Sequence, residues 1–223
     1  MYTLYGGKFT RAQIVQMLMA EAGIEYDLVE IDIIKQQHRS PEYLAINPAG
    51  YVPALRLDNG EVLHETHAIN LYLIDQHRLE HLGPLPGDPQ RGAFLSGLFF
   101  MADDLEPILK CLFYPQRYVL DEDDSAAMEQ KALQQVLARF EVIEHRLAQQ
   151  GPYYLGGRFS LVDIICSYWA VTLSIDSELR DLPAIREHMA LIRSRPLIKP
   201  LFDEMHRSSS EYLDKQVPGK GET

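Results

Sequence analysis

The sequence predicts an α/β domain followed by an all-helical domain. Strand and helix patterns follow one another over residues 1–80 in the order β-α-β-α-β-β-α, and only helical patterns follow residue 90. Residues 81–90, between the two parts, contain a cluster of Pro and Gly that is typical of a linker. A chain of 223 residues with 46% hydrophobic content is large enough to bury a core in each part.

The first three elements form a β-α-β unit, and a short helix follows them. Residues 2–5 are an apolar β-type run, and apolar residues at helical spacing then continue until Gly23, which ends the helix. Residues 26–33 alternate as a second strand does. Ser40 followed by a proline predicts an N-cap and a short helix that ends before Pro48.

A hairpin and a third helix complete the first domain. Residues 52–57 and 61–64 are its two strands, and the turn between them contains Asn59-Gly60, a strong hairpin signal. Thr66 is expected to be the N-cap of the next helix. We therefore place the first domain at residues 1–80.

The second half is predicted to be helical throughout. An apolar segment over residues 93–119 and an amphipathic pattern over residues 128–147 predict its first two helices. Residues 160–163, Ser-Leu-Val-Asp, match a capping box in which aspartate replaces the usual Glu or Gln, and they predict the start of another apolar helix. We expect the helical domain to span residues 91–207 and residues 208–223 to be a flexible tail.

Composition excludes several classes of function. The chain has 21 Lys and Arg against 32 Asp and Glu, a net charge of −11 that would repel a nucleic-acid backbone. We find no stretch apolar enough to span a membrane and no secretory leader, so we expect a cytoplasmic protein. Cys111 and Cys166 lie far apart in no metal-ligand spacing, and the paired histidines lack a third ligand, so we expect neither a disulfide nor a metal.

Three motifs resemble segments of the cytosolic glutathione transferases. Residues 47–55, NPAGYVPAL, resemble their NPxGxVPxL segment, and residues 63–69, LHETHAI, are similar to a second segment in which serine is usual where Thr66 stands. Residues 160–163 resemble the capping box of their C-terminal domain. The resemblance is to a bacterial-type member of unassigned class, and it implies a thioredoxin-like first domain and a helical bundle as the second.

The resemblance also implies a glutathione site in the first domain. Val52, through a cis bond to Pro53, would turn its N–H and C=O outward to pair with the cysteinyl unit of glutathione as an added strand. Glu65 would accept the γ-glutamyl amine, and Thr66, at a helix N-terminus, would bind the α-carboxylate. His38 is the expected contact of the glycyl carboxylate. Thr66 also fits an ordinary N-cap, and Pro53 an ordinary edge-strand proline.

Two side chains are candidates for activating the thiol, which a transferase must hold as thiolate. Tyr5, together with Arg11, matches the catalytic tyrosine pattern of the alpha, mu and pi transferases, whereas Thr10 matches the serine of bacterial and theta-like enzymes. In a third alternative neither side chain acts, and Lys8, Arg11 and main-chain N–H groups supply the field. Thr10 also fits a capping box with Gln13, and Tyr5 a half-buried strand aromatic.

The resemblance places the remaining contacts around the sulfur and on a second subunit. The electrophile would lie against aromatic side chains, for which the candidates are Phe9, Phe113, Tyr114 and Tyr118. Asp104, or its neighbour Asp103, would reach the glutathione amine of the other subunit in a homodimer.

Three classes of function stay open at this point. The first is a glutathione transferase that conjugates the thiolate to a small electrophile. The second is a glutathione-dependent isomerase, peroxidase or dehalogenase that uses the same site. The third is a non-catalytic protein that binds glutathione for regulation. Fold resemblance alone does not separate them.

Overall fold

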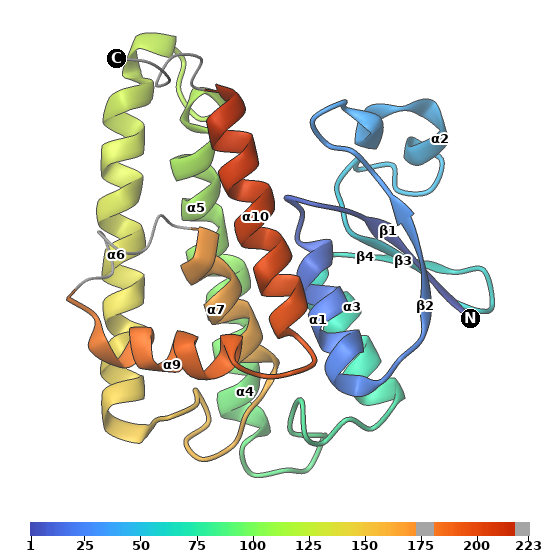
Figure 1. Ribbon diagram of the computed structural model, residues 1–223, viewed down its shortest axis with the longest axis vertical. Helices are drawn as coiled ribbons and strands as arrows, with labels where there is room; N and C mark the ends of the chain where they lie inside the picture. The colour runs from blue at the N-terminus through green and yellow to red at the C-terminus, as the bar shows by residue number, and fades with distance from the viewer. Residues whose placement is uncertain (173–180, 217–223) are drawn as a thin grey trace. The chain divides into compact units, whose positions relative to one another are not determined.

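The protein is described by a computed structural model over residues 1–172 and 181–216 (Figure 1). The chain divides into two compact units, one formed by residues 1–79 with the segment from residue 193 onward, and the other by residues 80–192. We expected residues up to 207 to belong with the helices of the second half. The segment that follows Ile192 groups instead with the sheet-containing unit.

The first unit is built on a four-stranded sheet in the order β2-β1-β3-β4. Its strands are β1, Tyr2–Gly6, β2, Tyr26–Glu30, β3, Ala54–Arg56, and β4, Val62–His64. β1 and β2 run parallel, and β3 pairs antiparallel with both β1 and β4. This mixed sheet confirms the predicted thioredoxin-like order of a β-α-β unit followed by a hairpin.

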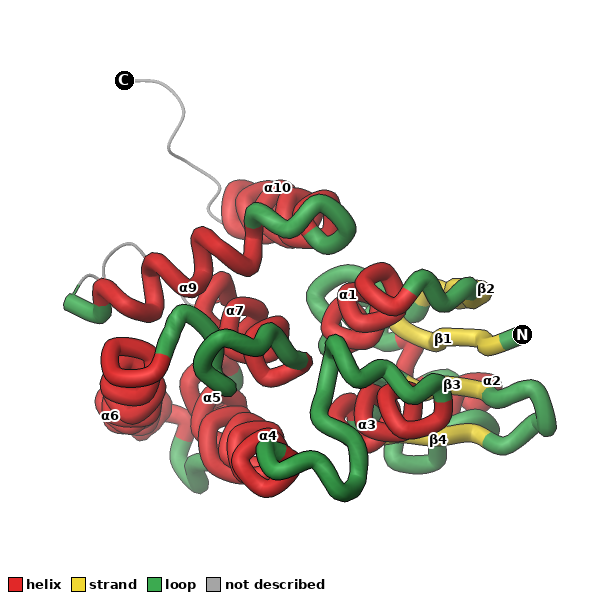
Figure 2. Tube along the Cα trace, turned by 90° about the horizontal axis from the view of Figure 1, so that it is seen from below, coloured by secondary structure: helices red, strands yellow, loops and turns green. Residues whose placement is uncertain are grey.

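Helices cover both faces of this sheet. α1, Ala12–Ala22, and α3, Thr66–Gln76, lie side by side on one face, and α2, Pro41–Leu44, lies on the other (Figure 2). The helix α10, Lys199–Gln216, belongs to the same unit and contacts α1. The first unit therefore contains the predicted α/β domain and α10, the last helix among the described residues.

The turn signals in the first half act as predicted. The Ser40 hydroxyl accepts the N–H of Tyr43 at 3.3 Å and caps α2, which follows a 3-10 turn, η1, at Gln37–Arg39. Gly60, in the hairpin, has φ of 89°, a backbone conformation that glycine adopts without steric cost. These local signals were reliable for a physical reason. The Ser40 hydroxyl gives a main-chain N–H its acceptor, and Gly60 adopts the dihedral angle that the turn requires.

Two boundaries differ from the expectation for simple physical reasons. β2 ends at Glu30 rather than at residue 33, because the Asp32 carboxylate accepts the N–H groups of Ile34 and Lys35 and turns the chain away from the sheet. α10 continues to Gln216, into the segment expected to be a tail from residue 208. Residues 217–223 of that tail lie outside the described residues.

The described part of the second unit is a series of helices. The long helix expected over residues 93–119 is a succession of three segments that ends at Phe113, because Pro115 lacks the N–H that a further turn requires. The segments of this unit are α4, Arg91–Phe99, the π-helical η2, Phe100–Leu105, α5, Glu106–Phe113, η3, Pro115–Arg117, η4, Glu122–Asp124, α6, Ser125–Gln150, α7, Leu161–Thr172, and α9, Pro183–Arg193, whose last residue passes into the other unit.

The predicted capping box opens α7. The buried Asp163 carboxylate accepts the Ser160 N–H at 2.7 Å and the Ser160 hydroxyl at 3.1 Å. It also accepts the N–H of Tyr154 at 2.7 Å. One carboxylate therefore joins the start of α7 to the turn that precedes it, as the sequence pattern predicts.

Within residues 1–172 and 181–216, no helix combines the length and the apolar character needed to cross a bilayer. Cys111 and Cys166 are both free thiols, and burial raises the pKa of the Cys166 thiol.

Candidate functional site

Strand register brings the candidate residues to one end of the first unit. Tyr5, near the end of β1, pairs with Ala54 at the start of β3, and Ala54 pairs with His64 at the end of β4. The turn into α1, the segment before β3 and the start of α3 therefore leave the sheet at the same end. Most of the residues assigned to glutathione lie in these three connections.

The segment before β3 is held by two side-chain hydrogen bonds to one carbonyl. The Tyr43 hydroxyl and the Asn47 amide each donate to the Tyr51 carbonyl at 2.7 Å. The bond between Val52 and Pro53 is cis. In the described part of the chain, no hydrogen bond involves the N–H or the C=O of Val52. Both groups can therefore pair with an added extended chain.

Burial raises the pKa of Tyr43 to about 12. Its hydroxyl therefore stays protonated and keeps donating to Tyr51 throughout the neutral pH range. Sequence patterns did not single out Tyr43, since an aromatic in a short helix gives no sign of a distant carbonyl partner. The Asn47 role was marked only by its place in the motif before Pro48.

Gly50 packs this segment against η1. Its φ is 64°, and a Cβ at this position would lie 2.6 Å from the Arg39 guanidinium and 3.1 Å from the His38 carbonyl oxygen. Arg39 also covers the Tyr51 ring at 5.5 Å from its centroid. The half-buried His38 is thereby fixed beside the segment that contains Val52.

The start of α3 differs from the expectation in an informative way. Glu65, not Thr66, occupies the N-cap position, and its φ of 71° is unusual for a residue other than glycine. Thr66 is the first residue of the helix and is buried. Among the described residues its hydroxyl has no hydrogen-bond partner, whereas its carbonyl accepts the Asn70 amide at 2.7 Å.

An unpartnered buried hydroxyl is costly, by about 1–3 kcal/mol. At Thr66 it stands beside the free N–H groups and the positive dipole end of α3, which favour an anion. The exposed Glu65 carboxylate lies next to it and suits a cation. The pair therefore offers complementary partners to a group that carries both a carboxylate and an amine.

Thr10 closes the turn between β1 and α1. Its hydroxyl donates to the Gly7 carbonyl at 2.7 Å and accepts the N–H groups of Gly7 and Ala12 at 3.2 and 3.3 Å. Arg11, not Thr10, is the N-cap residue of α1, and its side chain makes no capping hydrogen bond. Phe9, half-exposed at the tip of this turn, has a φ of 60°.

Tyr5 packs on the face of the sheet that α2 covers. It is 5% exposed and belongs to a buried cluster with Ile31, Tyr43, Val52 and Ala54. Its ring meets that of Tyr43 edge-on at 6.4 Å. The side chain of Tyr5 thus contributes to the core beneath the site.

The other candidates belong to the second unit. Asp104 lies in η2 and pairs with Arg139 at 3.1 Å. Phe113 ends α5, and Tyr114 and Tyr118 flank η3; all three side chains are 38–46% exposed.

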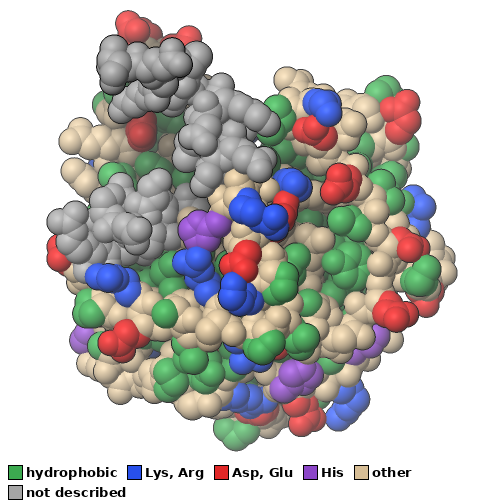
Figure 3. Space-filling view, viewed as in Figure 1, with side chains coloured by type: hydrophobic (Ala, Val, Ile, Leu, Met, Phe, Trp, Pro, Cys, Tyr) green, Lys and Arg blue, Asp and Glu red, His purple; other side chains and the backbone are tan. Residues whose placement is uncertain are grey.

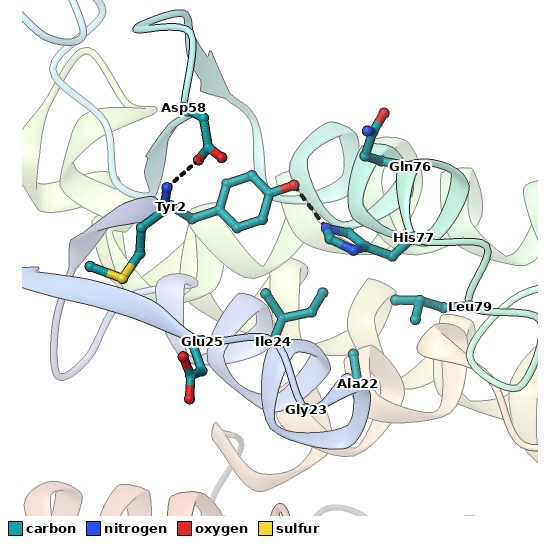
Figure 4. A pocket seen from close by; sticks show the side chains of 10 residues that line it. Tyr2, Ala22, Gly23, Ile24, Glu25, Asp58, Gln76, His77 and Leu79 are labelled. Carbon is teal, nitrogen blue, oxygen red and sulfur yellow. Dashed lines mark hydrogen bonds and ion pairs between the residues drawn. The ribbon is translucent and has the colours of Figure 1, made fainter.

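A surface hollow of 820 Å³ lies at the other end of the first unit (Figure 4). It is lined by the start of β1 and by the final turns of α1 and α3, and a 2.8 Å hydrogen bond joins Tyr2 to His77 in it. Because the candidate site lies at the opposite ends of these same elements, the hollow is separate from it. The described residues also contain no group of three or more His, Cys, Asp or Glu side chains that could hold a metal ion.

Comparisons with known proteins identify the family. Residues 10–76 match the family model described as glutathione S-transferase, N-terminal domain, and residues 106–196 match that of the C-terminal domain. The chain is 30% identical over 201 residues to a probable glutathione S-transferase of Oryza sativa subsp. japonica, covering 87% of this chain and 86% of that protein. The chain belongs to the glutathione S-transferase family.

Two other similar proteins are informative about ligand and activity. A glutathione transferase homologue from Sulfitobacter, solved with bound glutathione, has a TM-score of 0.78 and 26% identity, covering 92% of this chain and 98% of that one. A maleylacetoacetate isomerase of Pseudomonas aeruginosa is 35% identical over 111 residues, which cover 48% of this chain and 50% of that protein. The proteins to which the chain is similar thus include some named as glutathione transferases and one named as an isomerase.

Proposed function

We propose that the protein is a glutathione transferase that binds glutathione in the first unit and conjugates its thiolate to a small electrophile. The observation that carries this proposal is the start of α3, where a buried Thr66 hydroxyl without a partner adjoins an exposed Glu65 in a positive-φ conformation. Strained residues of this kind persist at ligand sites where the surroundings hold them. The Sulfitobacter relative, solved with bound glutathione, supports the choice of ligand.

Each part of glutathione has a matching group at this end of the unit. The free N–H and C=O of Val52, before the cis Pro53, pair with the cysteinyl unit. Thr66 and the α3 N-terminus bind the γ-glutamyl carboxylate, and Glu65 binds the amine. His38, fixed beside the same segment, binds the glycyl carboxylate.

We assign thiol activation to Thr10, assisted by main-chain N–H groups of the turn and by Arg11. Thr10 lies at the start of α1, whereas Tyr5 is packed into the core. To donate to sulfur, the Thr10 hydroxyl turns its proton from the Gly7 carbonyl toward the thiolate. Lowering the thiol pKa by about 2 units needs about 2.7 kcal/mol, which one hydroxyl and a helix N-terminus supply.

The reaction then needs no further cofactor group. The thiol proton leaves to solvent, and the sulfur electron pair forms the new carbon–sulfur bond. With an aryl halide or an epoxide, the carbon–halogen or carbon–oxygen bond breaks and its electron pair leaves with the halide or the ring oxygen. With an enone, the electrons of the carbon–carbon double bond move to the carbonyl oxygen, and a proton from solvent completes the adduct. Glutathione acts as a co-substrate and no metal takes part.

The electrophile contacts and the homodimer are proposed on the family resemblance. Phe9 and the exposed aromatics Phe113, Tyr114 and Tyr118 are assigned to the electrophile, and Asp104 to the glutathione amine of a second subunit. A cytoplasmic location fits two free cysteines and the supply of reduced glutathione there. Light scattering during size-exclusion chromatography tests the dimer, and a monomer removes the Asp104 role.

A second function, a glutathione-dependent isomerase, is favoured by the similarity to the maleylacetoacetate isomerase. An isomerase adds the thiolate and later releases it, so glutathione is not consumed. The deciding experiment measures glutathione consumption with aryl halides, epoxides, enones and hydroperoxides. Stoichiometric loss of glutathione to a thioether supports the transferase, and oxidation to the disulfide indicates a peroxidase. Turnover of a double-bond isomer without loss indicates the isomerase.

A further inference from the structure

An ion pair joins the turn at the proposed thiol site to α10. The Lys8 ammonium, in the turn between β1 and α1, lies 2.6 Å from the Glu204 carboxylate on α10. The same carboxylate accepts from Arg207 at 2.7 Å and from the Ser208 hydroxyl at 3.3 Å. The hydrogen bond from Lys8 is the main reason that the pKa of Glu204 is lowered. The carboxylate is therefore charged throughout the neutral range.

A second pair fixes where Glu204 lies. Arg195, just before α10, donates two hydrogen bonds to the Glu21 carboxylate near the end of α1, at 2.9 and 2.6 Å. The Glu21 side chain is only 5% exposed, so this pair is well shielded from water. Because α10 is tied to the end of α1 at one point and to the turn before α1 at another, the two helices run antiparallel. The ion pair between Arg195 and Glu21 therefore sets the position from which Glu204 reaches the turn.

The turn itself needs such support. Phe9, between Lys8 and Thr10, has a φ of 60°. A residue other than glycine keeps this backbone conformation only where the surroundings hold it. The Thr10 hydroxyl closes the turn from within, and the Lys8 ion pair holds it from outside.

We propose that Glu204 is a positioning residue of the glutathione site. Acting through Lys8, it lets α10 hold residues 7–10 in the arrangement that presents Thr10 and the main-chain N–H groups to the thiolate. The proposal rests on the proposed function for its catalytic consequence. Its structural part concerns the turn alone and is tested without glutathione.

The same helix offers a matched control. Asp203 pairs with Lys199 within α10 and is half-exposed, and none of its described contacts reaches the turn. On the face of the molecule shown in Figure 3, acidic and basic side chains are interspersed and do not gather into a large patch of one sign. Asp203→Asn therefore removes a neighbouring charge from α10 without touching Lys8.

The first test is amide hydrogen exchange of the ligand-free full chain. We expect exchange of the amides of residues 7–10 to become about two- to fivefold faster in Glu204→Gln. A change of this size corresponds to the modest stabilisation that a partly exposed ion pair provides. Asp203→Asn leaves these amides unchanged. Equal exchange in the wild type and Glu204→Gln overturns the proposal.

The second test is the pKa of the bound glutathione thiol, followed by thiolate absorbance in a double-mutant cycle with Lys8→Met. We expect Glu204→Gln to raise this pKa by about 0.3–0.7 units, the same two- to fivefold change. In the Lys8→Met background the same substitution has no effect, because Glu204 acts through Lys8. An additive effect, or no effect in either background, overturns the proposal.

High salt gives an independent check, because it screens a half-exposed pair. The thiol pKa of the wild type rises toward that of Glu204→Gln as salt is added, and that of the variant stays nearly constant. If the wild type itself fails to bind glutathione, the proposed function fails and takes the catalytic role of Glu204 with it. Faster exchange at residues 7–10 in Glu204→Gln then still shows that the ion pair holds the turn, so the two failures are distinguishable.

Discussion

At the residue scale, the Thr66 hydroxyl distinguishes between two interpretations of the start of α3, a ligand site and an ordinary helix cap. The sequence alone allowed both interpretations, because Thr before an apolar helix fits an N-cap as well as a carboxylate contact. In the structure Glu65 takes the N-cap position and the Thr66 hydroxyl bonds to none of the described residues. The hydroxyl therefore contributes little to folding, and its chemistry is available to a ligand.

Thr66→Val tests this interpretation directly. Valine keeps the shape of threonine and removes an unpartnered buried hydroxyl, so thermal stability stays unchanged or rises slightly. Glutathione affinity falls about tenfold or more, since a hydrogen bond to a charged group is worth about 1.5–3 kcal/mol. Calorimetric titration and thermal unfolding measure the two effects. Thr66→Ser is the matched control and retains binding. A loss of about 1 kcal/mol in stability with unchanged affinity would restore the N-cap interpretation.

Thiol activation gives a second prediction at this scale. Thr10→Val removes the proposed donor and raises the pKa of bound glutathione by about 1 unit or more, whereas Thr10→Ser keeps it low. Tyr5→Phe leaves this pKa unchanged, because the Tyr5 ring belongs to the core. Thiolate absorbance across the pH range measures each variant. A raised pKa in Tyr5→Phe alone would reverse the assignment.

At the element scale, turns and caps were predicted well and the ends of β2 and α5 poorly. The hairpin at Asn59-Gly60, the Ser40 cap and the Asp163 capping box all depend on residues within a few positions of one another. The end of β2 depends on the Asp32 side chain bonding to the main chain beyond it, and the end of α5 on a proline. Periodicity alone does not report these interruptions.

The capping box at the start of α7 is expected to contribute strongly to stability. Asp163→Ala leaves the N–H groups of Ser160 and Tyr154 without their acceptor inside a buried region. We expect a loss of about 3 kcal/mol or more in the free energy of unfolding. Ser160→Ala removes only the side-chain hydrogen bond and costs about 1 kcal/mol. Urea unfolding ranks the two variants, and equal losses would show that Asp163 is not the central acceptor.

At the scale of the whole molecule, the position of α10 was the main feature that the sequence did not predict. Composition and periodicity assigned residues 91–207 to one helical domain. The contacts that group α10 with the first unit, Glu21 with Arg195 and Lys8 with Glu204, join residues that lie far apart in the chain. A charged residue on a helix gives no sign of which distant partner it meets.

The ion pair between Arg195 and Glu21 is expected to stabilise the fold measurably. Arg195→Met leaves the shielded Glu21 carboxylate without its described bidentate partner, so we expect stability to fall by about 1–3 kcal/mol and α10 amides to exchange faster. Adding Glu21→Gln restores part of the loss, because the unpaired charge is then gone. Chemical unfolding with amide exchange checks both. If the single variant were as stable as the wild type, the pair would be only a surface contact.

The family and the glutathione site were predicted from three short motifs, and the family is confirmed by the comparisons. The motifs were informative because their residues make main-chain contacts that few other side chains replace, such as the Asn47 amide on the Tyr51 carbonyl. The electrophile is different, since exposed aromatics such as Tyr114 and Tyr118 suit many apolar partners. Substrate identity therefore has to come from activity measurements.

Every assignment at the site depends on the first unit binding glutathione and holding it as thiolate. The most direct test is a calorimetric glutathione titration of the full chain, paired with thiolate absorbance of the complex from about pH 5 to pH 9, a range that spans the ordinary thiol pKa. We expect saturable binding and a thiol pKa about 2 units below its ordinary value of about 8.5. Binding with an ordinary thiol pKa, or no binding, would contradict this expectation.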